Sequence, residues 1–210
     1  MNSETTEPTA ILLAAGKAAR YGKLKQLVEA KGKTLIRRAM DSIAQLNWTH
    51  DPLLVLGYRA EMIKERVDTS AFRVLENPSW EAGMSSSVEL SVRSSEADTS
   101  GYLFFLGDMP LVPSSVIESV IEKAEEGASI VAPAYHGQRG FPVFLDRSWK
   151  HKLLEEISGD RGARRIINQN REKVKLLETD HRGVVLDVDD QSDLEEVELY
   201  LEKEGKEIGI

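Results

Sequence analysis

The stretch from Ile11 to Leu27 reads I-L-L-A-A-G-K-A-A-R-Y-G-K-L-K-Q-L, and the fold follows from it. Residues 10–14 are all apolar, which predicts a strand buried on both faces. The run breaks at Gly16 into a loop with a second glycine and several cations. Glycine lets backbone amides approach phosphate oxygens closely, and cations neutralise the phosphate charge. A triphosphate-binding loop therefore agrees with this stretch better than a surface loop with solvated cations, which are Lys17, Arg20, Lys23 and Lys25.

The same stretch excludes two familiar phosphate-binding loops. The Walker pattern G-x-x-x-x-G-K-[ST] fails because Tyr21 replaces its second glycine and Leu24 follows Lys23. The dinucleotide fingerprint G-x-G-x-x-G fails because Ala18 occupies its second glycine position. A different kind of phosphate loop is indicated.

Composition limits the class of protein. At 210 residues with 41% hydrophobic content, the chain fits one domain with a full core. A net charge of -8 argues against nucleic acid as a partner, so an anionic substrate requires a local basic pocket. The absence of cysteine excludes disulfides, thiolate metal sites and a cysteine nucleophile. No apolar run approaches the roughly 18 residues that cross a bilayer, and the polar, acidic N-terminus does not resemble a signal peptide. We expect a cytoplasmic enzyme with no membrane partner.

Apolar runs alternate with amphipathic helical patterns along the chain. This alternation, at roughly 20 to 30 residues per unit, predicts an α/β fold with a mainly parallel central sheet and helices on both faces. We expect a disordered tail at 1–8, one domain at 9–203 and a C-terminal tail at 204–210. The predicted strands after the first are 52–56, 72–75, 102–106, 129–132, 141–145, 174–177 and 184–188, and the clearest predicted helices are 35–46, 112–126, 148–157 and 191–203.

Asp108 follows the most apolar predicted strand, in a G-D-x-P turn. An unpaired carboxylate in a crevice is costly, and Mg²⁺ prefers carboxylates together with phosphate oxygens. The alternative is a turn-initiating aspartate that bonds its own backbone. Ligands of such sheets bind beyond the carboxyl ends of the strands, so Asp108 and the basic loop should face one crevice. We therefore expect Asp108 to hold a metal.

A second carboxylate comes from the segment L-D-V-D-D at residues 186–190. Alternation along the predicted strand puts Asp187 and Asp189 on one face. We expect Asp189 to be the second metal ligand, with Asp187 as the alternative. Asp190 is expected to cap the next helix.

Two arginine-containing segments are candidates for binding an anionic acceptor. Arg139 and Gly140 lie in a glycine-rich turn, and Arg161 and Arg164 lie in G-D-R-G-A-R near an expected helix start, where amides face outward. The alternative is that these are ordinary surface arginines. Ser85 opens a serine run at another expected helix start and is a candidate for binding the nucleotide.

Motifs from several segments occur in an order that resembles a known family. L-A-A-G-x-x-x-R-x-G-x-x-K-Q-L, N-P-x-W-x-x-G-M-x-x-S, G-D-M-P, G-x-R-G-x-P and G-D-x-G-A-R follow one another as in molybdenum cofactor cytidylyltransferases, a branch of the MobA-like NTP transferase superfamily. The resemblance covers about residues 9 to 200. It departs from the family at Ala18, Ala19 and the pair Gln191-Ser192.

The resemblance implies a Rossmann-like nucleotidyltransferase fold and a Mg²⁺-dependent reaction. CMP would pass from CTP to the phosphate of molybdopterin, releasing pyrophosphate, and a molybdoenzyme would receive the product. In that family A-A-G accompanies cytidine, which makes Ala15 an indicator of CTP; the crowding of a purine by its methyl group is a hypothesis. Arg20, Lys25 and Asp108 would be catalytic, and the nucleotide-binding set would be Leu13, Ala14, Ala15, Gly16, Arg20, Lys25, Ser85 and Gly107.

Other functions are compatible with parts of this pattern. A guanylyltransferase, or a transferase acting on another phosphorylated acceptor such as a sugar phosphate, belongs to the same class. A nicotinamide-dependent oxidoreductase and a non-catalytic cofactor carrier belong to different classes. The missing dinucleotide fingerprint argues against the first of these, and the magnesium carboxylate against the second.

Overall fold

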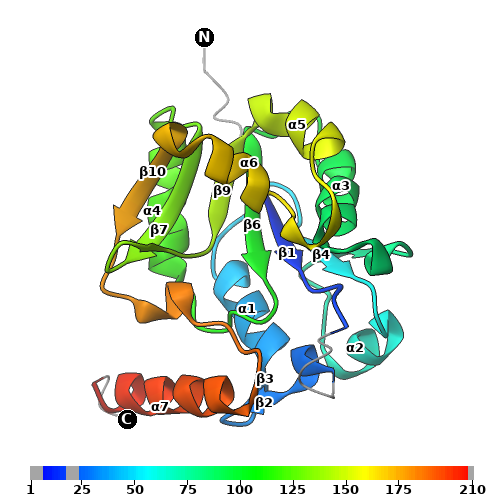
Figure 1. Cartoon of the computed structure of the whole chain (residues 1–210). Helices are drawn as coiled ribbons and strands as arrows, with labels where there is room; N and C mark the ends of the chain where they lie inside the picture. The colour runs from blue at the N-terminus through cyan, green and yellow to red at the C-terminus, as the bar shows by residue number, and fades with distance from the viewer. Residues whose placement is uncertain (1–6, 18–23, 208–210) are drawn as a thin grey trace.

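The computed structural model describes residues 7–17 and 24–207 and shows a central sheet between two layers of helices (Figure 1). The sheet path is β10-β7-β9-β6-β1-β4-β5, and β8 pairs with β7 outside this path. Strand β1 (Thr9–Leu13), an inner strand next to β6, is buried along its whole length, as its apolar sequence predicts. The other strands are β4 (Leu53–Leu56), β5 (Arg73–Glu76), β6 (Gly101–Leu106), β7 (Ile130–Tyr135), β8 (Gln138–Arg139), β9 (Val143–Asp146) and β10 (Val174–Glu178).

The sheet is mainly parallel, which confirms the predicted fold class. β6, β1, β4 and β5 are parallel to one another, and β10 is parallel to β7. β9 is antiparallel to both of its neighbours, β6 and β7. The chain leaves β7 through a hairpin with β8 rather than through a crossover helix, so it re-enters the sheet in the reverse direction.

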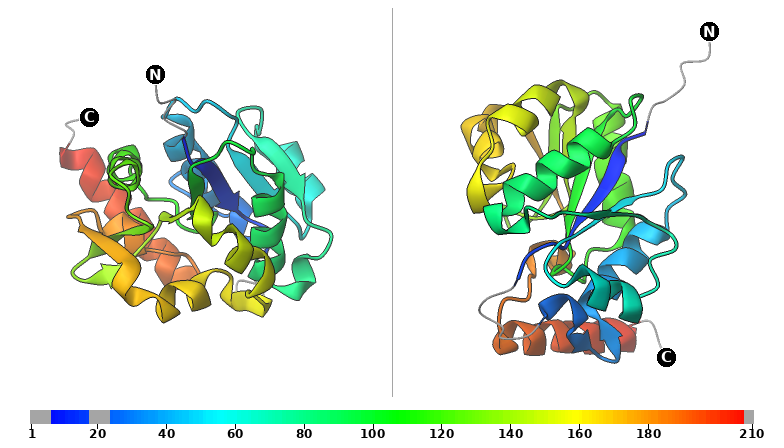
Figure 2. Two further views of the ribbon diagram at one scale, coloured as in Figure 1. Left: turned by 90° about the horizontal axis from the view of Figure 1, so that it is seen from above. Right: turned by 90° about the vertical axis from the view of Figure 1, so that its right-hand side faces the viewer.

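Helices cover both faces of the sheet (Figure 2). Alternating side chains of β1 explain how: Leu12 packs in a cluster with α1 and α4, whereas Ile11 and Leu13 pack in a cluster with α3, α5 and α6. The helices are α1 (Leu35–Ala44), α2 (Ala60–Arg66), α3 (Met84–Ser94), α4 (Ser114–Glu125), α5 (Lys150–Glu155), α6 (Arg164–Gln169) and α7 (Gln191–Glu207). None of the helices in the described ranges is both long and apolar enough to cross a membrane.

The C-terminal helix α7 lies beyond the sheet, against a small two-stranded ribbon of β2 (Glu29–Ala30) and β3 (Lys33–Thr34). Their contact forms a third apolar cluster that includes Leu35, Val188 and Val197. The predicted cap Asp190 is confirmed, since it accepts a hydrogen bond from the Ser192 amide at 2.8 Å. Thr34 caps α1 by accepting a hydrogen bond from the Arg37 amide at 3.3 Å.

The ends of the domain extend beyond the predicted boundaries. The carbonyl of Glu7 accepts a hydrogen bond from the Ser100 amide at 3.0 Å, within the predicted tail 1–8. α7 continues to Glu207, into the predicted tail 204–210. Residues 1–6 and 208–210 lie outside the described ranges.

The prediction of a strand at 184–188 is wrong. A 3-10 helix, η6 (Arg182–Val185), occupies its first half, and the rest is irregular. Val184 and Val188 are buried because their segment packs against two loops. In the loop before β9, the Phe141 amide donates to the Val184 carbonyl at 2.9 Å, and the Val188 amide donates to the Asp108 carbonyl at 3.0 Å. The apolar alternation therefore reflects burial without pairing in the sheet.

Two of the sequence motifs pack directly on each other. Gly83, from N-P-x-W-x-x-G-M, has φ of 93° and lies against Gly159 and Asp160 of G-D-x-G-A-R. A Cβ on Gly83 would lie 2.5 Å from the Gly159 carbonyl carbon and 2.6 Å from Asp160 Oδ1. The close approach of these two loops thus requires glycine at position 83.

Gly83→Ala is expected to destabilise the fold by about 2 kcal/mol or more, because backbone strain and overpacking each cost roughly 1–3 kcal/mol. Gly127→Ala is the matched control, since Gly127 has φ of 90° but open space around its Cα. Urea unfolding of both variants measures the difference. Equal losses of stability in the two variants would show that the contact between the loops contributes nothing.

Candidate nucleotide and metal site

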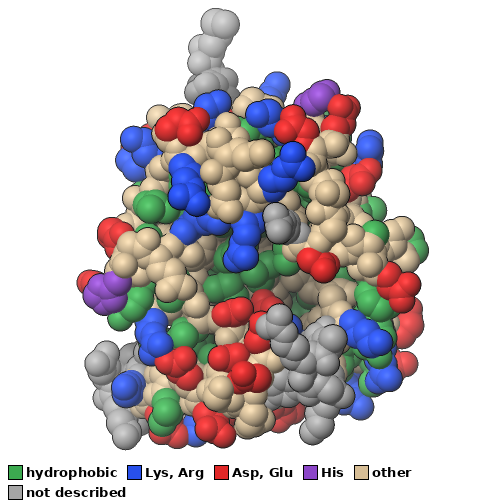
Figure 3. Space-filling view, viewed as in Figure 1, with side chains coloured by type: hydrophobic (Ala, Val, Ile, Leu, Met, Phe, Trp, Pro, Cys, Tyr) green, Lys and Arg blue, Asp and Glu red, His purple; other side chains and the backbone are tan. Residues whose placement is uncertain are grey.

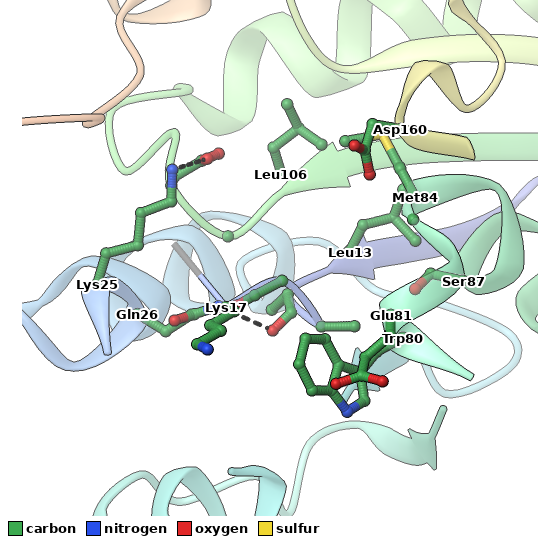
Figure 4. A pocket seen from close by; sticks show the side chains of 16 residues that line it. Leu13, Lys17, Lys25, Gln26, Trp80, Glu81, Met84, Ser87, Leu106 and Asp160 are labelled. Atoms are coloured by element: carbon green, nitrogen blue, oxygen red, sulfur yellow. Dashed lines mark hydrogen bonds and ion pairs between the residues drawn. The ribbon is translucent and has the colours of Figure 1, made fainter. Parts of the chain in front are cut away.

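A cavity of about 460 Å³ opens at the carboxyl ends of β1 and β6 (Figure 4). This is the edge of the sheet where the sequence predicts a crevice. Lys25 and Gln26 lie on one side of it, and Trp80, Met84 and Asp160 on the other. Arg20 lies outside the described residues. The predicted nucleotide-binding residues that line the cavity are Leu13, Ala14, Ala15, Gly16, Lys25 and Gly107.

Ser85, the remaining predicted nucleotide contact, is buried in the first turn of α3 and is not among the lining residues. Ser87 lines the cavity in its place. The turn of α3 decides which serine of the run faces the cavity.

Gln26 holds the beginning of the loop after β1 in place. Its side-chain amide donates to the carbonyl of Ala14 at 3.0 Å and to that of Gly16 at 2.9 Å. The side chain is almost fully buried, so these bonds are protected from water. Gln26 is not among the residues predicted for the site, because a neutral side-chain amide does not stand out in the sequence as a charged residue does.

Glycines opposite the two alanines of the loop allow close packing. A Cβ on Gly107 would lie 2.9 Å from the Ala14 Cβ, and a Cβ on Gly57 would lie 2.9 Å from the Ala15 Cβ. The Ala15 carbonyl also accepts a bond from the Tyr58 amide at 3.0 Å. The alanine pair is therefore held tightly at the floor of the cavity.

Lys25 joins the two carboxylates that were predicted to bind a metal. Its Nζ lies 2.6 Å from Asp108 Oδ2 and 2.8 Å from Asp189 Oδ1. Burial lowers the pKa of Lys25, but the charges and hydrogen bonds of the two carboxylates outweigh it and raise the pKa above its ordinary value. The ammonium thus stays protonated at neutral pH and bridges residues that are far apart in the sequence.

Asp108 has one oxygen without a partner. Within the described part of the chain, its Oδ1 is buried and makes no hydrogen bond. A buried carboxylate oxygen without a partner is costly unless a ligand or cation completes its coordination. This feature favours the metal role over the turn role for Asp108.

Asp187 adds a third carboxylate to the same region. Its neighbour Val188 donates an amide bond to the Asp108 carbonyl at 3.0 Å. Partial burial raises the pKa of Asp187, and the charge of Asp108 raises that pKa further. Three carboxylates facing one lysine leave an excess of negative charge, which a divalent cation would neutralise.

The donor set fits a cation that also takes oxygens from a bound nucleotide. Among the described residues, no group of three or more histidine, cysteine, aspartate or glutamate side chains is arranged to hold a metal by itself. Asp108 and Asp189 would supply two oxygens, and phosphates and water the rest, which is the usual manner of binding Mg²⁺.

The far wall of the cavity comes from two loops. Trp80 and Glu81 belong to η2 (Trp80–Ala82), and Asp160 belongs to η4 (Gly159–Arg161). The rings of Trp80 and Tyr58 lie 5.2 Å apart. Arg161 and Arg164 of the motif G-D-R-G-A-R are the residues predicted to bind the acceptor, and Asp160, directly before Arg161 in η4, lines this cavity.

Arg139, Arg164 and Arg171 lie close enough for their charges to act on one another. Arg139 is half-buried, and this burial lowers its pKa, as do the positive charges of Arg164 and Arg171. In the described ranges, none of the three has a carboxylate within 4 Å. Lysine and arginine side chains gather over α6 and β10, above a hollow whose lower edge is acidic (Figure 3). We call these three residues the arginine cluster.

Gly140 has a structural reason to be glycine. A Cβ there would overlap the carbonyl of Val184 in η6. Its amide donates to the Pro133 carbonyl at 2.8 Å. The prediction that Gly140 contacts the acceptor thus has no support in this geometry, and the residue serves to seat η6.

Comparison with known proteins agrees with this arrangement. The family described as MobA-like NTP transferase domain matches residues 10–174. The chain belongs to this family. The predicted superfamily is therefore confirmed, whereas the narrower cytidylyltransferase branch is not singled out.

Individual relatives of this MobA-like protein carry different descriptions. A protein described as nicotine blue oxidoreductase, from Paenarthrobacter nicotinovorans, is 28% identical over 189 residues, covering 86% of this chain and 91% of its own. The solved Rv0371c homologue from Mycobacterium sp. strain JC1 is 26% identical, with a TM-score of 0.82 over 93% of this chain and 96% of that one. Rv0371c from Mycobacterium tuberculosis H37Rv in complex with manganese is 24% identical, with a TM-score of 0.77 over 91% and 98%.

Proposed function

We propose that this MobA-like protein is a magnesium-dependent cytidylyltransferase that moves CMP from CTP to the phosphate of a molybdopterin-type acceptor. The observation that carries the proposal is the bridge from Asp108 through Lys25 to Asp189, at the mouth of the 460 Å³ cavity. Membership of the NTP transferase family supports the reaction class.

The proposed reaction needs no protein nucleophile. An oxygen of the acceptor phosphate attacks the α-phosphorus of CTP, and the bond from this phosphorus to the β-bridging oxygen breaks, so that pyrophosphate leaves. Catalysis then consists of positioning and charge stabilisation. Lys25 and Arg20 would hold the β- and γ-phosphates, with Lys25 exchanging a carboxylate partner for a phosphate oxygen. Asp108 and Asp189 would hold Mg²⁺, which neutralises phosphate charge when bound.

The walls of the cavity support a nucleoside next to these phosphates. Glu81 and Asp160 offer carboxylate oxygens to the hydroxyl or amino groups of a nucleoside, and Trp80 offers an aromatic surface. The choice of CTP over GTP depends on Ala15, which is held against Gly57 and has little freedom to move aside for a larger base. We propose that this restricted space disfavours a purine.

The arginine cluster supports an acceptor that carries a phosphate. Guanidinium groups bind phosphate through paired hydrogen bonds, and cations so close together gain from a bound anion. A molybdoenzyme would receive the product of a molybdopterin acceptor, as the resemblance in sequence implies.

An oxidoreductase is the second candidate function, because a relative with that description aligns with most of this chain. It would have to bind a reduced nicotinamide without the G-x-G-x-x-G fingerprint, which is absent after β1. The same binding experiment separates the two candidates.

The test is thermal unfolding with Mg²⁺ and CTP, GTP, UTP, ATP, NADH or NADPH in turn. A ligand at 100 times its dissociation constant stabilises by about 2.7 kcal/mol, which raises Tm by roughly 5–10 °C for a chain of this size. We expect a metal-dependent shift with CTP, a smaller one with GTP, and then pyrophosphate release from CTP with molybdopterin. A GTP preference would assign the guanylyl reaction, and a shift with NADH or NADPH alone would refute the transferase proposal.

A further inference from the structure

A second cavity, of about 420 Å³, lies between the β7–β8 hairpin, η6 and the first turns of α7. It shares no lining residue with the nucleotide cavity. Among its lining residues, Asp187 lies near the carboxylates of the proposed metal site. Its lining residues are Tyr135, His136, Gln138, Arg182, Val185, Leu186, Asp187, Asp193 and Glu196.

Some of the polar lining residues already serve the fold. Arg182 forms an ion pair with Glu196. Asp193 Oδ2 accepts bonds from the amides of Asp189 and Asp190, at 2.7 and 2.9 Å. These contacts hold the segment that carries the metal-site aspartates. Tyr135, Gln138 and Asp187 are left to meet a ligand.

The charge of the lining selects the kind of ligand. Three carboxylates, from Asp187, Asp193 and Glu196, face one guanidinium, that of Arg182. A phosphate here would be repelled, whereas N–H and O–H donors would find acceptors on Asp187 and Gln138. Val185 and Leu186 add apolar surface, and the edge contact of the Tyr135 and His136 rings, with centroids 4.3 Å apart, adds aromatic surface. A neutral ring rich in donors suits this lining.

The cavity also adjoins the reaction centre. Asp187 lines it and lies one residue before Val188, whose amide is bonded to the Asp108 carbonyl. Asp108 in turn lines the nucleotide cavity. Gln138 lines the second cavity from β8, and the next residue of this strand, Arg139, points to its opposite face. The second cavity thus lies beside the carboxylates of the reaction centre.

We propose that this second cavity binds the uncharged body of the acceptor, a ring or polyol rich in N–H and O–H donors, through Asp187, Gln138 and Tyr135. The acceptor phosphate then faces the junction of Asp108, Lys25 and Asp189, beside the arginine cluster. This inference rests on the proposed transferase function. A pterin with a hydroxylated side chain has the required donors. In its phosphate ester, the ring would occupy the second cavity and the phosphate would lie near the arginine cluster.

The first experiment uses neopterin, a pterin without phosphate, titrated into the full chain and followed by its fluorescence. We expect saturable binding that Gln138→Leu and Asp187→Leu each weaken by about tenfold or more, because each removes an acceptor for a ligand donor. Gln45→Leu is the matched control, since Gln45 is an exposed glutamine at the end of α1 that lines neither cavity. Absence of neopterin binding, or equal binding by all four proteins, would overturn the proposal.

The second experiment measures CMP transfer from CTP to molybdopterin with the same variants. We expect Gln138→Leu to raise KM for molybdopterin by about tenfold. Its KM for CTP should equal that of the Gln45→Leu control. If transfer occurs and the acceptor KM does not change, the cavity proposal is wrong and the transferase proposal stands. If no transfer occurs but the variants lose neopterin binding, the cavity binds such rings and the transferase proposal fails.

Discussion

Asp108→Asn is expected to lower the rate of CMP transfer by about 10²–10³-fold, the usual cost of removing one preorganised charge from a reaction centre. The physical reason is that Asp108 supplies a buried oxygen that no other described group satisfies. The substitution keeps the size of the side chain and an acceptor for Lys25, so the fold should be retained. The measurement is pyrophosphate release at saturating CTP and Mg²⁺, together with Tm.

The control for this variant is Asp180→Asn, because Asp180 is an exposed aspartate that lines neither cavity. Its activity and stability should match those of the unmodified protein. A transfer rate within about twofold of normal in Asp108→Asn, which corresponds to less than 0.5 kcal/mol, would refute the assigned role.

Lys25→Met is expected to cause a similar loss, about 10²–10³-fold in rate, since Lys25 is the described cation closest to the carboxylate pair. The substitution has a second effect that a general structural defect would not produce. Removing the ammonium takes one positive charge away from Asp108 and Asp189 and frees the position between them, so Mg²⁺ or Mn²⁺ alone should raise Tm more in this variant than in the unmodified protein.

Lys150→Met is the matched control, because Lys150 is exposed and lines neither cavity. It should respond to the metal as the unmodified protein does. Should the metal shift Tm equally in Lys25→Met and in Lys150→Met, the lysine and the metal do not share the two carboxylates. The proposed exchange of Lys25 from carboxylate to phosphate would then be wrong.

Charged residues next to strand ends were the most predictable part of the site. Lys25 and Asp108 stand out in the sequence because a cationic loop and an aspartate each follow a fully apolar run. Parallel strands deliver their carboxyl ends to one edge, so two such signals imply one crevice. Asp189 was predicted for a partly incorrect reason, since its segment alternates without being a strand.

Other members of the site carry no comparable signal. Gln26 acts through two hydrogen bonds to the backbone, which only the folded loop reveals. Arg171 is an ordinary arginine until η5 (Arg171–Lys173) places it near Arg139. Gly140 resembles a ligand-contacting glycine in its motif, but the carbonyl of Val184 occupies the space beside it.

Local pattern was enough to predict the α/β class and the buried strand β1, because periodicity and residue type act over a few neighbouring positions. Tertiary structure decided the reversed direction of β9, the contact of Gly83 with Gly159, and the meeting of Lys25 with Asp189. It also decided that basic side chains gather above a hollow whose lower edge is acidic (Figure 3). These features depend on contacts between residues far apart in the chain, whose distances are set by packing of the whole core and leave no trace in any single segment.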